Sequence, residues 1–264
     1  MGLGATRIAC STLLVAAPAV AQNDPICADR PGQTTPACTV PAGMTQIETT
    51  ALDWARDRAD GVSADELRIG ESVIKLGLTE RLDIELEAAP FVRIRTRDGG
   101  ARETLSGFGD IAFAAKYRLT GEAAPVRVAV KPFVKIPTAK RSLGNGKVEG
   151  GLVVPIDYAI PGSQLSLALT SEIDINADSD GSGHHVATAQ AIGFGASLFS
   201  RLSVSADVSA YWDFDSAGTI RQYALGGSAA YLLSNDVQLD AGVNVGLNRE
   251  TPDIQAYSGI AFRF

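Results

Sequence analysis

The chain has 264 residues, of which 45% are hydrophobic and 20% charged, and its formal net charge is −7. The negative balance argues against a nucleic-acid partner. No run of residues approaches the roughly 20 apolar positions that a membrane-spanning helix needs.

Arg7 stands before an apolar run that ends at the small-residue site Ala-Val-Ala at 19–21. A positive residue, an apolar stretch and such a site are typical of a secretory signal peptide. We expect residues 1–21 to be this peptide, with cleavage before Gln22. The mature protein is therefore expected to be exported and not held in an inner membrane.

Two cysteines follow, Cys27 and Cys38, in an N-terminal segment of residues 22–42 that we place in the periplasm. A lone pair in an oxidising compartment predicts a disulfide. The alternative, a metal site, lacks further ligands because His184 and His185 are far along the chain. We expect no metal and no cofactor. The sequence leaves open whether the segment hangs free or folds into the domain that follows as a plug.

From residue 43 to residue 264 the apolar residues recur at every second position, which predicts strands. The turn signals divide this part into about twelve strands, near 44–53, 66–78, 81–97, 107–120, 125–137, 147–160, 163–176, 185–199, 201–214, 219–233, 236–248 and 252–264.

The connections between these strands alternate in length along the chain. One set is short, near 78–81, 120–125, 159–163, 199–201 and 233–236. The other is longer and polar, near 57–65, 98–106, 138–146, 177–184, 215–218 and 248–252. Up-and-down hairpins would gather each set at one end of the sheet. Short periplasmic turns and longer external loops are typical of outer-membrane barrels.

The last strand carries Ile254, Ala256, Ile260, Phe262 and Phe264 on one face. We interpret this aromatic ending as the signal read by the machinery that assembles outer-membrane barrels. The apolar faces then contact lipid, where an open sheet edge would leave backbone groups unpaired, so the antiparallel sheet must close. A soluble β-sandwich with an apolar core is the alternative.

The opposite face of the predicted strands carries charges of both signs. The candidates for lining a pore or binding a ligand are Asp83, Glu85, Arg93, Arg95, Asp110, Lys116, Arg118, Lys131 and Lys135. These residues either line a polar path for a solute or form cross-strand salt bridges that close the lumen.

Catalysis is not expected from this sequence. His184 and His185 follow an Asp- and Ser-rich stretch at 178–183, but no Gly-x-Ser-x-Gly elbow accompanies them. Neighbours on a loop do not make a catalytic triad. We therefore predict no catalytic residue and no enzyme activity.

Four ordered motifs carry a family resemblance: Leu-Gly-Leu-Thr-Glu-Arg-Leu-Asp at 76–83, Ser-Gly-Phe-Gly-Asp-Ile at 106–111, Lys-Tyr-Arg-Leu at 116–119 and Lys-Ile-Pro-Thr at 135–138. Together they resemble the bacterial outer-membrane family labelled as the MetA pathway of phenol degradation, over roughly residues 45–264. The resemblance implies a transmembrane barrel that takes up hydrophobic or aromatic compounds.

Within the second motif, the glycines at 107 and 109 allow a bend or bulge where a strand enters the barrel. Asp110 is expected to pair with an arginine of a neighbouring strand, Arg93 or Arg95.

These observations predict a closed, all-β, up-and-down barrel in the bacterial outer membrane, acting as a channel or uptake protein for small molecules. Its partners would be membrane lipid, a small solute and the assembly machinery. Two alternatives stay open: a structural or partner-binding barrel with an occluded lumen, and a soluble periplasmic protein that binds a ligand. The solute and the oligomeric state are not specified by the sequence.

Overall fold

The computed structural model describes residues 24–121 and 123–264, and the expected signal peptide, residues 1–21, lies outside this part. The strands are β1 (Thr45–Ala59), β2 (Val62–Ile69), β3 (Ser72–Thr79), β4 (Leu82–Ala88), β5 (Phe91–Asp98), β6 (Ala101–Gly107), β7 (Ile111–Arg118), β8 (Val126–Ile136), β9 (Glu149–Ala159), β10 (Leu165–Ala177), β11 (His184–Phe199), β12 (Leu202–Asp215), β13 (Gly218–Ser234), β14 (Val237–Gly246) and β15 (Ile254–Arg263). Among the described residues, no helix is long and apolar enough to cross a membrane.

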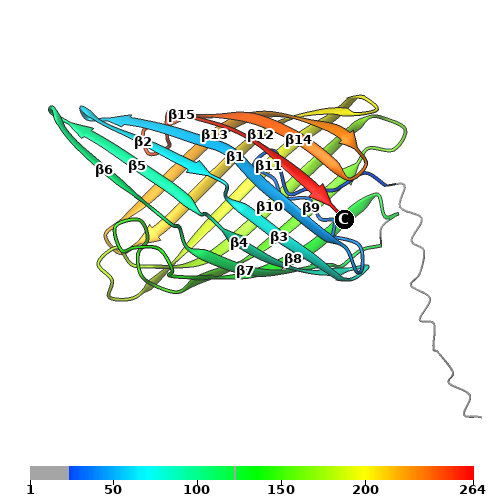
Figure 1. Ribbon diagram of the computed structural model, residues 1–264, viewed down its shortest axis with the longest axis horizontal. Helices are drawn as coiled ribbons and strands as arrows, with labels where there is room; N and C mark the ends of the chain where they lie inside the picture. Colours follow the sequence, from blue (N-terminus) through cyan, green and yellow to red (C-terminus); the bar gives the residue numbers. More distant parts are fainter. Residues whose placement is uncertain (1–23, 122) are drawn as a thin grey trace, which may run out of the picture.

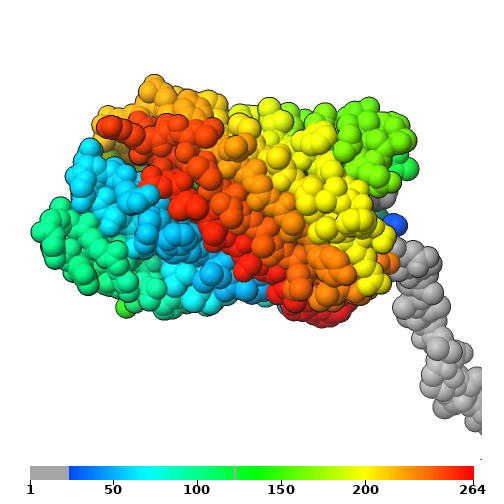
Figure 2. All heavy atoms as spheres, turned by 90° about the horizontal axis from the view of Figure 1, so that it is seen from above, coloured from blue at the N-terminus to red at the C-terminus, as the bar shows by residue number. Residues whose placement is uncertain are grey.

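All the strands join one antiparallel sheet that closes on itself. β1 pairs with β15 from Gln46 opposite Arg263 to Arg56 opposite Ile254. In Figure 2 the red β15 lies between the blue β1 and the orange β14. The fifteen segments make twelve wall strands, because β2 runs on into β3, β4 into β5, and β6 into β7. The predicted twelve-stranded closed barrel is confirmed.

The chain returns at the end of the barrel that holds the C-terminus through short turns (Figure 1). Residues 80–81, 200–201 and 235–236 make three of them. The opposite, external end carries the longest connection, residues 137–148, together with 178–183 and 247–253.

Two segments that we expected to be external loops, 57–65 and 98–106, are instead hairpins of regular strand. Their turns need only Asp60-Gly61 and Gly99-Gly100. All four residues have positive φ, with Asp60 at 51° and Gly61 at 83°, and this conformation matches a tight turn to the twist of its strands. The external end is therefore extended by paired strands on the β1–β6 side (Figure 1).

Burial is inverted relative to a soluble protein. Large apolar side chains are exposed around the outside, for example Ile192 at 61% and Val208 at 52%. The most buried large side chains are polar or charged, including Lys75, Lys116 and Asp83 at 1% each. Exposed apolar walls suit lipid, and the buried charges lie inside the barrel. This arrangement excludes the soluble alternative, and the protein is located in the outer membrane.

Four adjacent wall strands are interrupted at the same height, and we call this line the crease. β1 shifts register just after Thr50, and β2 and β3 separate at Gly70. β4 and β5 separate at Ala89-Pro90, and β6 and β7 at residues 108–110. The Gly70 N–H donates to Thr50 O at 2.8 Å, and the Gly109 N–H to Ala89 O at 2.8 Å. Pro90 has no N–H for the ladder, so the sheet breaks there.

The crease changes which residues face inward. The third wall strand consists of β4 and β5. On the short-turn side of the crease its residues Asp83 and Glu85 are buried, whereas on the external side Val92 is buried and Ile94 lies on the same face as Val92. An extra residue in a strand with a period of two moves every later side chain to the other face. Beyond the crease β6 is the last strand in the pairing order, and no described strand pairs with its free edge.

Candidate functional site

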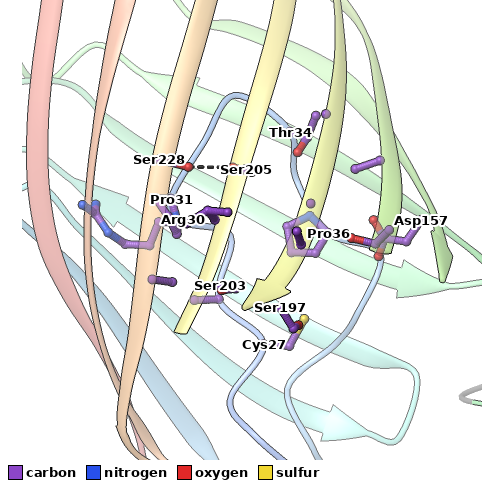
Figure 3. A pocket seen from close by; sticks show the side chains of 18 of the residues that line it. Cys27, Arg30, Pro31, Thr34, Pro36, Asp157, Ser197, Ser203, Ser205 and Ser228 are labelled. Carbon is purple, nitrogen blue, oxygen red and sulfur yellow. Dashed lines mark hydrogen bonds between the residues drawn. The ribbon is translucent and has the colours of Figure 1, made fainter. Parts of the chain in front are cut away.

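The N-terminal segment, residues 24–44, lies inside the barrel, and we call it the plug (Figure 3). A Cys27–Cys38 disulfide closes a loop within it. Its two ends are fixed at the short-turn end: the Ile26 N–H donates to Asn235 O at 2.6 Å, and the Gly43 N–H to Gly77 O at 2.8 Å. The sequence left open whether this segment hangs free or fills the barrel. Its contacts show that it lies inside the lumen.

Asp29 of the plug meets three lysines from three wall strands. Its carboxylate oxygens lie 2.5 Å from Lys116 Nζ, 2.9 Å from Lys75 Nζ and 3.3 Å from Lys131 Nζ. Glu48 is the second acid in this cluster, 2.5 Å from Lys75 Nζ, and it also accepts the Asp29 N–H at 3.0 Å. β1, β3, β7 and β8 therefore converge on one residue of the plug.

These lysines control the ionisation of Asp29. Burial on its own would raise the pKa of Asp29, but Lys116, Lys75 and Lys131 hold it well below its usual value. The carboxylate is therefore charged at neutral pH, as the ion pairs require.

Arg30 fixes the plug to a second part of the wall, formed by β14 and β1. Its guanidinium donates to both carboxylate oxygens of Asp240, with distances of 2.9 Å from Nε and from one terminal nitrogen, and its other terminal nitrogen donates to Thr50 Oγ1 at 2.7 Å. A bidentate pair of this kind specifies orientation as well as adding energy. Asp29 and Arg30 thus bind adjoining parts of the wall, and β1 contributes to both sites through Glu48 and Thr50.

The backbone of the plug is also paired with the wall. Its N–H groups donate to side chains of four strands: Gly32 to Tyr257 Oη at 3.0 Å, Thr35 to Thr170 Oγ1 at 2.8 Å, Ala37 to Asp157 Oδ2 at 2.8 Å and Val40 to Asp83 Oδ2 at 2.8 Å. A non-helical segment buried in a barrel needs such partners, because buried backbone groups without them are costly.

The plug divides the lumen into separate cavities. One, of about 340 Å³, lies on the short-turn side between Arg30, Thr34 and Pro36 of the plug and the wall, near the hydrogen-bonded pair Ser205 and Ser228 (Figure 3). Two others, of about 360 and 490 Å³, lie toward the external end. A solute that crosses the barrel must pass the plug.

The largest of these three cavities, about 490 Å³, lies beside the crease and has two kinds of lining. Its apolar part is formed by Val92, Ile94, Phe133, Leu143 and Val153. Its charged part is formed by Glu66, Arg68, Glu71, Glu85, Glu87, Asp110, Lys131, Lys135 and Glu172. The volume is in the range of small-molecule sites, and the lining offers both an apolar and a polar surface.

Seven of the nine candidate residues are on the inner side of the wall. They are Asp83, Glu85, Asp110, Lys116, Arg118, Lys131 and Lys135. Asp83, Lys116 and Lys131 bind the plug, and Arg118 donates to Glu80 O at 2.6 Å beside a short turn.

The interpretation of Arg93 and Arg95 needs correction. They pair with Leu67 and Asp65 of β2, on the face opposite to Val92 and Ile94, and so point outward. The crease is the cause, since an unbroken strand over 81–97 would have kept them on the inner face. Asp110 does not reach them and instead lies 3.1 Å from Lys135 Nζ.

Sequence reasoning missed three members of the central cluster, Asp29, Glu48 and Lys75. Lys75 stood between Ile74 and Leu76 in a period-two run, which was a usable sign of an inward charge. Asp29 gave no such sign, because the plug has no periodicity.

A second cluster lies at the external end, around His185. Its Nδ1 is 2.9 Å from Asp178 Oδ1 and 3.8 Å from Asp215 Oδ2, and its Nε2 is 2.5 Å from Asp213 Oδ1. Asp178, His185 and Asp215 could hold a metal ion. The same distances suit a protonated imidazole between carboxylates, so the geometry does not require a metal.

Comparison with known proteins agrees with this architecture. A family model described as "Putative MetA-pathway of phenol degradation" matches residues 28–264, which confirms the expected resemblance and extends it over most of the plug. No functionally curated protein matches the chain.

Two solved structures share the fold. The COG4313 outer membrane channel from Pseudomonas putida F1 is 14% identical with a TM-score of 0.69, covering 89% of this chain and 99% of that one. The translocator domain of the autotransporter NalP from Neisseria meningitidis is 12% identical with a TM-score of 0.50, covering 85% of this chain and 90% of that one.

Proposed function

Because the chain belongs to the family described as "Putative MetA-pathway of phenol degradation", and because its barrel holds a cavity with a large apolar part, we propose that it takes up small hydrophobic or aromatic compounds across the outer membrane. The proposal adds to the channel function the class of solute that is transported.

The lining of the 490 Å³ cavity carries the proposal. Val92, Ile94 and Phe133 offer an apolar surface for a ring or short chain, and burying such a group is worth about 25 cal/mol per Å² of apolar area. The other side is polar and rich in carboxylates, since Arg68 pairs with Glu66 and Lys131 with Glu85, so it suits a hydroxyl group. A wide hydrophilic pore would not need an apolar lining of this kind.

The plug makes the uptake gated in this proposal. Its ion pairs to Lys116 and Asp240 block free diffusion along the axis, so passage to the periplasm needs a shift of the plug. In a lumen closed by a plug, the solute would bind in the cavity first and be released to the periplasm when the plug shifts.

The proposal includes no chemical step. His184 and His185 are assigned no catalytic role, and no cofactor or nucleic acid takes part. We further propose that Phe264, exposed at the end of the chain and stacked on Phe262 at 6.0 Å, is recognised by the barrel-assembly machinery.

The test is uptake of a radiolabelled aromatic alcohol by cells that carry Ala114→Trp. Ala114 lines the largest cavity, so an indole there fills it and should lower uptake several-fold. Ala115→Trp is the matched control: Ala115 pairs with the exposed Ile84, so its side chain faces lipid and uptake should stay unchanged.

Equal uptake by cells with and without the protein would favour the alternative, a structural or partner-binding barrel with an occluded lumen. The many salt bridges between plug and wall are the observation that keeps this alternative in view.

A further inference from the structure

The outer face of the wall above the crease is strongly basic. β1, β5 and β6 present on this face a set that we call the arginine wall: Arg56, Arg58, Arg93, Arg95, Arg97 and Arg102. The register fixes the face, since Arg95 lies opposite both Asp65 and Thr104, and Asp65 lies opposite Arg56. Arg68 and Glu66, on the other face of β2, line the inner cavity.

Few acids balance this charge. Asp65 lies 2.7 Å from Arg56 and 3.6 Å from Arg97, and Asp253 lies 2.8 Å from Arg58. For the guanidinium groups of the other three, Arg93, Arg95 and Arg102, no ion pair or hydrogen bond is found among residues 24–121 and 123–264.

Two of the arginines are direct cross-strand neighbours, since Arg97 of β5 pairs with Arg102 of β6. Like charges at such positions are destabilising, so the wall has uncompensated repulsion that an anion would relieve. The chain as a whole has a net charge of −7, so this concentration of positive charge is local.

The depth of the arginine wall identifies the kind of anion. On the same outer face, Phe91 precedes Arg93 in β5, Leu67 lies opposite Arg93, and Trp54 lies opposite Leu67, so the first arginine borders the apolar and aromatic residues of the lipid-facing band. Arg93 is the next outward residue after Phe91, about 7 Å along the strand, and Arg97 is about 13 Å further. Aromatic residues mark the membrane interface, and head groups occupy roughly the next 5–8 Å. The first arginines therefore stand at the depth of lipid phosphates.

The choice of arginine also favours phosphate. A planar guanidinium binds a phosphate through two parallel hydrogen bonds, whereas lysine acts as a point charge. Arg56 lies 5.1 Å from the ring centre of Trp54, so one guanidinium already stands directly over an interfacial aromatic ring.

We propose that the arginine wall binds the phosphate groups of lipid in the outer leaflet of the outer membrane. Arg93, Arg95 and Arg102 are the free donors. Arg56 and Arg97, which both form ion pairs with Asp65, complete the site. The bound lipid would hold the crease and the free edge of β6 in place at the external leaflet.

The test measures binding of fluorescent bisphosphorylated lipid A to the full-length mature protein in detergent. The variant is Arg93→Gln/Arg95→Gln/Arg102→Gln, and we expect its affinity to fall about tenfold or more, because several charge-assisted hydrogen bonds are lost. The control is Lys140→Gln/Arg141→Gln/Lys147→Gln, which removes the same charge from the 137–148 connection and should change affinity less than about twofold.

Four further measurements make the result decisive. Dephosphorylated lipid A should bind the wild type as weakly as it binds the variant, and inorganic phosphate should compete only weakly, because the site is built for lipid at the interface. A shift in gel mobility on heating checks that each variant is a folded barrel, and Arg93→Lys/Arg95→Lys/Arg102→Lys should bind with intermediate affinity. Equal binding by the glutamine variant and its control, or binding that ignores the phosphates, overturns the proposal.

Discussion

Asp29 is the residue on which the closed state of the lumen depends most. It is the one plug carboxylate that three wall lysines share, at 2.5, 2.9 and 3.3 Å. Removing one partner from a buried pair costs about 3–5 kcal/mol, because the remaining charge is left without compensation. We therefore expect Asp29→Asn to loosen the plug and raise single-channel conductance in planar bilayers several-fold.

Asp24→Asn is the matched control for this change. Asp24 lies at the start of the plug and its carboxylate forms no ion pair among the described residues, so conductance should stay near that of the wild type. An Asp29→Asn channel with unaltered conductance would contradict the role of this cluster.

The same carboxylate predicts the response to pH. The pKa of Asp29 in the folded protein is lowered, so its contribution is complete above the ordinary value of about 3.9 and is lost as pH falls from there through the folded pKa. The wild-type lumen should thus stay closed at neutral pH and open only in strong acid. In Asp29→Asn this acid-dependent step should be smaller, because the group that titrates has been removed.

At the scale of the element, the crease decides which side chains meet the lumen and which meet lipid. Spin labels at successive positions of β5 test it directly. We expect labels at Phe91→Cys and Arg93→Cys to be mobile and accessible from outside, and labels at Val92→Cys and Ile94→Cys to be immobile inside the barrel. Electron paramagnetic resonance line shapes and collision with oxygen measure this.

The reverse pattern, with Val92 outside, would mean that β4 and β5 form one uninterrupted strand. Asp83→Cys and Ile84→Cys serve as reference positions, because β4 lies below the crease with Asp83 buried and Ile84 exposed.

The crease also marks the part of the fold that the sequence pattern did not predict. The alternation in each run predicted the strands, and the bend or bulge expected at Gly107 and Gly109 corresponds to the break between β6 and β7. The breaks at Gly70 and Ala89-Pro90 were passed over, because one extra residue hardly disturbs a period-two pattern while it reverses every later side chain. Arg93 and Arg95 were assigned to the wrong face for that reason alone.

At the scale of the whole molecule, the barrel could be predicted because its cause is repeated in every strand. Each wall strand has an apolar face for lipid, and closure follows from the cost of unpaired backbone in hydrocarbon. The site could not be predicted, because Asp29 and Arg30 of the plug find their partners in wall strands distant along the chain. Contacts of that kind are specified by three-dimensional proximity and leave no local pattern.

The wall and the plug are separable in this architecture, and deleting residues 24–42 tests that. The ladder between β1 and β15 begins at Gln46 and does not involve the deleted residues, so the barrel should still close and shift in gel mobility on heating. Without the plug, Lys75, Lys116 and Lys131 lose Asp29 and keep two acids, Glu48 and Glu85. Conductance should therefore rise well above that of Asp29→Asn, and the reversal potential in a salt gradient should shift toward anions. A channel of unchanged conductance would show that the wall alone limits flow, whereas greater conductance with no anion preference would place the lysines outside the path.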